Sequence, residues 1–301
     1  MQNIIPHLWF DRQAREAAEF YISLFPGSRL TNVTRLSNTP SGDCDLVYFE
    51  LAGLPFMAIS AGPLFRFNPS VSFQVGCRTK EEVDALWEQL SQGGTVLMPL
   101  GAYPFSARFG WVEDRYGLSW QVMQTAENPA AQKITPMLMF VGDVCGKAEE
   151  AINFYADVWA GAPGRSSRDI RTDVLSRYGA GELPDQGGTV RYARLALAGQ
   201  EFAVMDSAHE HKFRFNEATS FLIPCDTQEQ IDYFWEKLSA DPKAEQCGWL
   251  KDKYGLSWQV APAVMREILT GSDKARMERV TQAFLKMKKF DMAAIQRAAA
   301  G

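Results

Sequence analysis

Few side chains in this sequence are of the types that do chemistry, and they lie far apart. His7 lies in IPHLWF, a run in which His7 and Trp9 would share one face of a strand. An imidazole there can bind a metal ion, move a proton or hydrogen-bond a ligand. His209 and His211 lie two residues apart in the charged segment DSAHEHKFRF, without carboxylates at metal-ligand spacing, and we expect them at the surface. Histidine chemistry near the start of the chain must therefore use His7.

Other familiar catalytic patterns are missing from the sequence. There is no GxSxG, HExxH, P-loop or GxGxxG motif, and no cysteine lies beside a histidine. The five cysteines are scattered and none forms a CxxC pair, so we expect reduced thiols rather than disulfides or a zinc site. Motifs alone therefore predict no reaction.

Composition and charge exclude several classes of protein. The 301 residues are 46% hydrophobic and 22% charged, with a net charge of −5, which is ordinary for a folded chain and excludes disorder. Residues 263–301 carry eight basic and four acidic side chains, so the rest of the chain is acidic, which argues against nucleic acid as a partner. No apolar run reaches the ~18–20 residues of a membrane span, and no secretory signal pattern opens the sequence. We expect a cytoplasmic protein that binds neither nucleic acid nor membrane.

The sequence repeats itself. GWVEDRYGLSWQV at 110–122 returns as GWLKDKYGLSWQV at 248–260, with ten of 13 positions identical. The FRFN segment at 65–68 also returns at 213–216. This self-similarity predicts two copies of one domain, residues 1–125 and 133–262, joined by the polar segment 125–133 and followed by a helical tail at 263–301.

Each copy reads as two βαβββ modules, which makes the fold α+β. Apolar residues recur at helical spacing after the first strand of each copy, and Thr79 and Thr227 open capping boxes. Between Trp235 and Gly248 the second copy is ten residues shorter than the first, which predicts the loss of one strand. The repeated DxYG segments, with Asp114 and Asp252, are explained by turn formation.

These combined motifs resemble the PhnB-like branch of the vicinal oxygen chelate superfamily, which includes glyoxalase I, bleomycin-resistance proteins and extradiol dioxygenases. The resemblance rests on three segments: IPHLWF with the following D-x-x-A-x-E-A-x-x-F-Y, then FPGS, and D-x-Y-G-x-x-W-Q. The resemblance implies two tandem glyoxalase/bleomycin-resistance-type domains built of paired βαβββ modules, plus C-terminal helices. It also implies a cup formed by the two modules of a domain, in a monomer or homodimer. This branch is often labelled 3-demethylubiquinone-9 3-methyltransferase, but the glycine-rich loop of a Rossmann-type methyltransferase is missing.

Active members of the superfamily hold a divalent metal in this cup, with ligands on the first, fourth, fifth and eighth strands. In this sequence those positions fall on His7, Ser60, Ser72 and Gln121. One imidazole, one amide and two hydroxyls make a weak donor set, so we expect no tightly bound metal. The matching residues of the second copy contain no nitrogen ligand: Met137, Asp206, Ser220 and Gln259.

Three functions remain open on this reading. In the first, the cup of the first domain binds a small planar or carbonyl-bearing molecule through His7, Trp9, Ser60, Ser72, Gln74 and Gln121, without a tight metal. In the second, Zn, Ni, Fe or Mn held by His7 and Gln121 assists a glyoxalase, isomerase or dioxygenase reaction. In the third, the second domain and the tail have a structural or partner-binding role.

Overall fold

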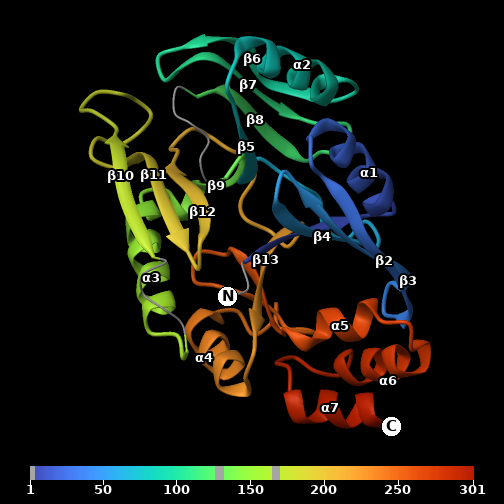
Figure 1. Ribbon diagram of the computed structural model, residues 1–301. Coiled ribbons are helices and arrows are strands. Elements are labelled where there is room, and N and C mark those ends of the chain that lie inside the picture. The colour runs from blue at the N-terminus through green and yellow to red at the C-terminus, as the bar shows by residue number, and fades with distance from the viewer. Residues whose placement is uncertain (1–3, 126–131, 165–169) are drawn as a thin grey trace.

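The computed structural model describes residues 4–125, 132–164 and 170–301 (Figure 1). Most of the expected linker, residues 126–131, lies outside the described residues. Residues 1–125, called repeat 1, form these elements: β1 (Ile5–Phe10), α1 (Ala14–Leu24), β2 (Arg29–Thr39), β3 (Gly42–Leu51), β4 (Leu54–Ser60), β5 (Val71–Cys77), α2 (Lys80–Ser91), β6 (Thr95–Tyr103), β7 (Ser106–Glu113) and β8 (Ser119–Gln124).

Residues 133–262, called repeat 2, follow the same order with one strand fewer. Its elements are β9 (Ile134–Phe140), the short 3-10 helix η1 (Gly142–Val144), α3 (Ala148–Ala160), β10 (Arg171–Arg177), β11 (Val190–Leu197), β12 (Gln200–Asp206), β13 (Thr219–Cys225), α4 (Gln228–Leu238), β14 (Trp249–Lys251) and β15 (Ser257–Pro262). Between α4 and β14, residues 239–248 form a loop with one isolated bridge where repeat 1 has β6.

The strands form two sheets, and each sheet takes one module from each repeat. Sheet A has the order β14-β15-β13-β1-β4-β3-β2, and sheet B the order β10-β11-β12-β9-β5-β8-β7-β6. The repeats join where β1 runs antiparallel to β13 and β5 antiparallel to β9. The expectation that two modules of one repeat build one cup is therefore wrong. Each module has a first strand whose edge can pair with another module. Because the two repeats have similar sequences, the sequence does not indicate which module that is.

One face of each sheet is buried against the other sheet, and we call it the core face. In repeat 1, Phe56 of sheet A lies 5.3 Å from Phe73 of sheet B, measured between ring centroids. In repeat 2, Phe202 and Phe221 are 5.1 Å apart in the same way. Helices α1 and α2 pack into the first of these cores and α3 and α4 into the second, and the second cluster also includes repeat-1 residues such as Tyr48 and Met57 together with the helices of the C-terminal tail. The opposite face of each sheet is called the cup face.

Both sheets curl toward their cup faces. His7 on β1 and Trp249 on β14 are separated by three strand intervals, about 14 Å in a flat sheet, yet their ring centroids are 5.3 Å apart. In sheet B, Tyr192 on β11 reaches Gln74 on β5 across the same number of intervals with a 3.1 Å hydrogen bond. Side chains distant along a sheet therefore meet on its cup face.

Local sequence signals act as expected at helix starts and turns. The hydroxyls of Thr79 and Thr227 accept the third-residue N–H groups of α2 and α4, while the Glu82 carboxylate reaches the N–H one residue before the cap. Asp114 accepts four hydrogen bonds, from two backbone N–H groups, Trp120 and Tyr21. Its repeat-2 equivalent is bonded in the same way. The turn interpretation of DxYG is thus confirmed.

The tail joins the two edges of sheet A. It forms α5 (Val264–Thr270), α6 (Lys274–Phe284) and α7 (Met292–Ala300), seen in red in Figure 1. At one edge, the hydroxyl of Thr34 on β2 donates to the carbonyl of Leu269 at 2.7 Å. At the other, the N–H groups of residues 247 and 248 donate to carbonyls of residues 287 and 288, just before β14. The tail thus contacts the edge left open by the lost strand.

Candidate functional site

The structure divides the six predicted site residues among three places. His7 and Trp9 lie on the cup face of sheet A, since the alternate residues Leu8 and Phe10 belong to the core of repeat 1. Ser72, Gln74 and Gln121 lie on the cup face of sheet B and make hydrogen bonds there. The six residues therefore do not line one cup.

Ser60 lies on neither cup face. It pairs with Phe10 in the parallel register of β1 and β4, which places it on the core face. Its hydroxyl accepts the N–H of Ala14, the first residue of α1, at 3.1 Å. At the equivalent position, the Asp206 carboxylate accepts the N–H of Ala148, the first residue of α3. The residue that the resemblance makes a ligand therefore holds the start of a helix.

We call the surroundings of His7 on sheet A the His7 site. His7 lies in register between Met57 of β4 and Ser220 of β13, and Ser220 lies in register with Ser257 of β15. Only 2% of His7 and none of Ser257 is exposed. The imidazole Nδ1 and the Ser257 hydroxyl oxygen have no hydrogen-bond partner. Two buried polar atoms without partners therefore lie on one row of the cup face.

Aromatic rings enclose the His7 site. The rings of Trp249 and His7 are perpendicular, and the ring centroid of Trp9 lies 6.0 Å from that of Trp249. The indole N–H of Trp9 donates to the carbonyl of Gly62 at 2.8 Å, which holds the ring in place. Burial lowers the pKa of His7 to about 3. The imidazole is therefore neutral near pH 7, with one nitrogen that donates and one that accepts.

We call the corresponding region of sheet B the glutamine site. Tyr192 donates to Oε1 of Gln74, Nε2 of Gln74 donates to Oε1 of Gln121 at 3.0 Å, and Nε2 of Gln121 donates to the Ser72 hydroxyl at 2.9 Å. Both glutamines are more than nine-tenths buried. The chain of bonds links the two halves of the curled sheet.

The two sites share one glutamine–serine hydrogen bond but differ in the tryptophan and serine beside it. Gln259 bonds Ser220 at 2.9 Å in the His7 site, as Gln121 bonds Ser72 in the glutamine site. In the glutamine site, Trp111 donates to Ser119. In the His7 site, the equivalent Trp249 faces the imidazole, and the equivalent Ser257 is left without a partner.

Three residues of the two sites, Trp249, Ser257 and Tyr192, are not marked as site residues by the motifs. Ser220 and Gln259 are predicted only as the matching positions of the second copy. Aligning the two repeats places Ser220 with Ser72 and Gln259 with Gln121, and the same alignment could have found Ser257 and Trp249. Their meeting with His7 follows from the exchange of modules, which the repeat does not reveal.

The residues of neither site fit the divalent metal that the fold family implies. The His7 site offers one imidazole nitrogen together with Ser220 and Gln259, which already bond each other. The glutamine site offers hydroxyl, amide and thioether groups with a single carboxylate, that of Glu113, in register with Ser119. Stable sites for zinc, nickel or iron need about three strong nitrogen, sulfur or carboxylate donors. Across the described ranges, no group of three or more His, Cys, Asp or Glu side chains is placed to hold a metal ion.

The two remaining histidines are not part of a group of three such donors in the described ranges either. His209 is 62% exposed at its side chain and lies 3.7 Å from a carboxylate oxygen of Asp185. The ring of His211 shares a 2.9 Å hydrogen bond with the hydroxyl of Ser207. The expected surface position is confirmed for His209, and His211 is half-buried.

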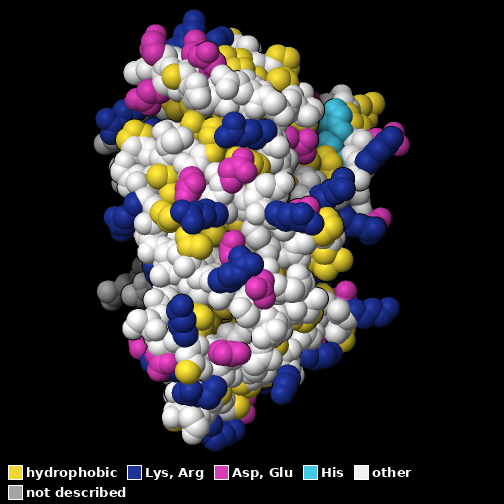
Figure 2. Space-filling view, turned by 90° about the vertical axis from the view of Figure 1, so that its right-hand side faces the viewer, with side chains coloured by type: hydrophobic (Ala, Val, Ile, Leu, Met, Phe, Trp, Pro, Cys, Tyr) yellow, Lys and Arg dark blue, Asp and Glu magenta, His cyan; other side chains and the backbone are white. Residues whose placement is uncertain are grey.

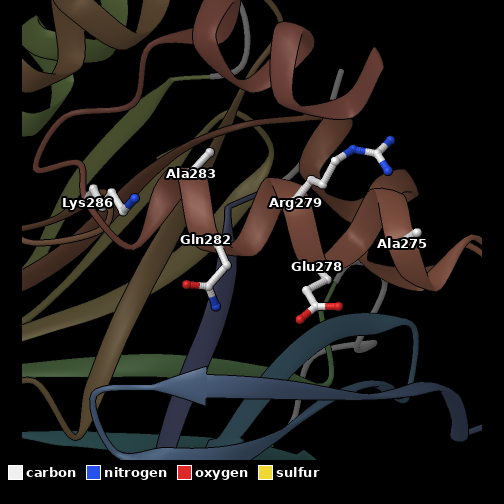
Figure 3. Close-up of a pocket in the computed structure, with 6 residues that line it drawn as sticks. All are labelled: Ala275, Glu278, Arg279, Gln282, Ala283 and Lys286. Atoms are coloured by element: carbon white, nitrogen blue, oxygen red, sulfur yellow. The ribbon is translucent and has the colours of Figure 1, made fainter. Parts of the chain in front are cut away.

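A recess of about 520 Å³ lies along α6, away from both cup-face sites. Figure 3 shows Glu278 and Gln282 on one side of this helix and Arg279 on the other. The Arg279 guanidinium donates to the carbonyls of Ala298 and Ala299 at the end of α7. The recess therefore belongs to the packing of the tail helices.

In the part of the chain that the structure describes, no helix has the length and apolarity needed to cross a membrane. Basic and acidic side chains are interspersed over the face shown in Figure 2. Nucleic-acid binding needs basic side chains gathered on one face, and this face shows no such gathering.

Comparison with known proteins identifies the family. The model of the 3-demethylubiquinone-9 3-methyltransferase family matches residues 2–123 and again residues 132–261. None of the curated proteins compared with this chain matches it. Among solved structures, a Bacillus cereus PhnB protein is 40% identical over 41% of this chain and 100% of its own, with a TM-score of 0.39. Pseudomonas aeruginosa PA1353 is 27% identical over 41% of this chain and 98% of its own, with a TM-score of 0.37.

A larger share of the chain matches a plant enzyme in fold. Glyoxalase I from Zea mays covers 87% of this chain and 93% of its own, with 13% identity and a TM-score of 0.51. That likeness shows the fold alone, and it agrees with the tandem βαβββ architecture expected from the motifs. The chain therefore belongs to the PhnB-like 3-demethylubiquinone-9 3-methyltransferase family and has a fold like that of glyoxalase I, with its two sheets shared between the tandem repeats.

Proposed function

We propose that the protein binds a small organic molecule at the His7 site, without a tightly held metal ion. The observation that carries the proposal is the pair of buried atoms without partners, Nδ1 of His7 and the hydroxyl oxygen of Ser257. Leaving a buried polar group unsatisfied costs about 1–3 kcal/mol. A ligand with a hydroxyl or carbonyl group near each atom would remove that cost.

The size and charge of the site narrow the ligand. His7 and Ser257 lie on strands two intervals apart, roughly 10 Å between backbones. Trp9 and Trp249 supply flat apolar walls beside the imidazole. Because His7 is neutral, it offers a carboxylate no opposite charge, and burying an unpaired charge is costly. A neutral, planar molecule bearing oxygen therefore fits best.

The other two functions have less support at this site. A metal-assisted reaction needs donors that His7, Ser220 and Gln259 do not provide, so we derive no step through a metal. The family name refers to a methyltransferase, and the sequence lacks the GxGxxG loop of the Rossmann-type enzymes. The tail has hydrogen bonds to both edges of sheet A, from Thr34 to the carbonyl of residue 269 and from Gly248 to the carbonyl of residue 288. These bonds favour a structural role for the tail.

Ligand screening of matched variants tests the proposal. A library of neutral aromatic alcohols and ketones is screened by thermal shift against the wild type, Ser257→Ala and His7→Leu. Ser119→Ala, at the equivalent position of sheet B, is the control. We expect hits that raise the melting temperature of the wild type and the control, with at least a tenfold weaker Kd for His7→Leu. Failure to find any hit that His7→Leu binds at least tenfold more weakly than the wild type would overturn the assignment.

Elemental analysis of the native, tag-free protein tests the metal-free part of the proposal. We expect less than a tenth of an equivalent of zinc, nickel, iron or manganese. A near-stoichiometric metal that is lost in His7→Ala would contradict the proposal and favour the metal-assisted reaction.

A further inference from the structure

The glutamine site contains two buried amides whose hydrogen bonds are incompletely used. Gln74 and Gln121 are 8% and 6% exposed. Each side-chain nitrogen carries two hydrogens, and each donates one hydrogen bond, to Gln121 and to Ser72 respectively. Within the described residues, the second hydrogen of each nitrogen has no acceptor.

The missing acceptors do not depend on how the oxygen and nitrogen of each side-chain amide are assigned. If both amides were turned over, each would still donate once and accept once along the chain. A spare lone pair on an amide oxygen is tolerated in protein interiors more readily than an N–H without an acceptor. The site is therefore complete only when an oxygen atom accepts from the two amides.

The surroundings of the amides are apolar and adaptable. Methionines lie on the cup face of sheet B, because strand register or alternation along a strand places them on the same face as Ser72, Gln121 and Trp111: Met98, Met123, Met137, Met139 and Met205. These are five of the 11 methionines in the chain. Thioether side chains adjust to the shape of what they contact and pack well on aromatic rings. Such a wall suits an apolar ligand body.

Charge decides between a carbonyl and a carboxylate as the acceptor. On the three central strands β5, β8 and β9, the cup-face side chains are uncharged: Ser72, Gln74, Ser119, Gln121, Met123, Thr135, Met137 and Met139. Glu113 on β7 shares this face beside Ser119, and burial raises the pKa of its carboxyl group, with Asp114 adding to the shift. A bound anion would meet the acidic Glu113 here, while a cup-face cation, Arg194 on β11, is exposed and lies three strand intervals from β5.

We propose that the glutamine site is a second ligand site, chemically distinct from the His7 site, for a neutral apolar molecule with a carbonyl oxygen. The oxygen accepts the free N–H of Gln74 and that of Gln121, and the methionines enclose the ligand body. Tyr192 and Ser72 hold the two amides in position from either end. This site does not depend on His7 or on any metal ion.

Three small probes of similar shape test the proposal: 1-tetralone, which has the carbonyl, tetralin, which lacks it, and 1-naphthoate, which carries a charge. Binding is followed by NMR through the side-chain amide signals of Gln74 and Gln121. We expect 1-tetralone to move both signals, and to bind about tenfold or more tightly than tetralin and than 1-naphthoate. Equal binding of tetralin would refute carbonyl recognition, and tighter binding of 1-naphthoate would refute the neutral ligand.

Variants separate this site from the His7 site. Gln121→Leu should weaken 1-tetralone binding about tenfold, whereas Gln259→Leu, which breaks the same bond to serine in sheet A, should leave it unchanged. A loss of binding in Gln259→Leu alone would place the probe at the His7 site and overturn the proposal. If Gln121→Leu does not fold, the ratio of 1-tetralone to tetralin binding in the wild type still decides. Failure of all three probes to move the Gln74 and Gln121 signals would also overturn it, with no consequence for the His7 site.

Discussion

Replacing His7 with leucine should remove a large part of the acid sensitivity of folding. The pKa of His7 is about 3 in the folded protein, because burial disfavours the charged imidazolium, and its ordinary value is 6.5. Below pH 6.5 the unfolded chain therefore binds a proton at this position that the folded chain does not bind. That proton favours unfolding. Its effect on the free energy of unfolding is therefore small above pH 6.5, and the free energy of unfolding falls as the pH drops toward 3.

The size of the effect follows from the two pKa values. At pH 5, protonation of the unfolded imidazole lowers the free energy of unfolding by about 2 kcal/mol, and at pH 7 by only about 0.2 kcal/mol. The wild type should therefore lose about 2 kcal/mol more than His7→Leu between these two pH values. Carboxyl groups that titrate in the same range contribute equally to both proteins and cancel in the difference.

Urea unfolding at pH 7 and pH 5 measures this difference directly. The exposed His209 provides the matched control, and His209→Ala should lose as much stability as the wild type. If His7→Leu also loses as much as the wild type, then His7 is not buried in solution. That result would refute the enclosed site on which the proposed function depends.

Three more predictions follow from the architecture. Because each sheet contains strands of both repeats, calorimetry should show one unfolding transition. Tyr21→Phe and Tyr155→Phe should each lower its melting temperature by about 3 °C, because each removes a hydrogen bond to a buried carboxylate that contributes about 2 kcal/mol. Two transitions, each moved by one variant, would show independent repeats. Gly248→Ala should lower the free energy of unfolding by about 2 kcal/mol or more, since its φ is +83° and an added Cβ would lie 2.4 Å from the Phe290 ring; an unchanged urea midpoint would mean that the tail is not docked there. The fragment 1–125 should form a dimer in sedimentation, because its first strands β1 and β5 lose their partners β13 and β9, and a stable monomer would contradict the exchanged pairing.

The repeat and the modules could be predicted because they are written in local patterns. Apolar spacing marks α1 and α3, the capping threonines mark the starts of α2 and α4, and the DxYG segments mark tight turns. Each of these signals acts over a few residues, through hydrogen bonds and packing within one module. They remain valid wherever the module is placed.

Pairing between modules could not be predicted from such patterns. The choice of β13 rather than β5 as the neighbour of β1 joins residues more than 200 positions apart, and the two candidate strands begin alike, with TSF and VSF. The position of Ser60 was missed for a related reason. Strand alternation turns every side chain over when the register moves by one residue, so a one-residue error exchanges the cup face for the core face.

The exchange of modules explains how one duplicated pattern produces two different sites. Each cup face combines one module of repeat 1 with one module of repeat 2. Two equivalent residues of the repeats therefore lie in different sites, and each has different neighbours there. His7 of repeat 1 meets Ser220 of repeat 2, whereas the equivalent Met137 of repeat 2 meets Ser72 of repeat 1. The lost strand and the tail contacts belong to sheet A, where Trp249 of β14 contacts the histidine. The two cup faces of a chain duplicated in this way therefore share their glutamine–serine bond and differ in the side chains around it, without a change of fold.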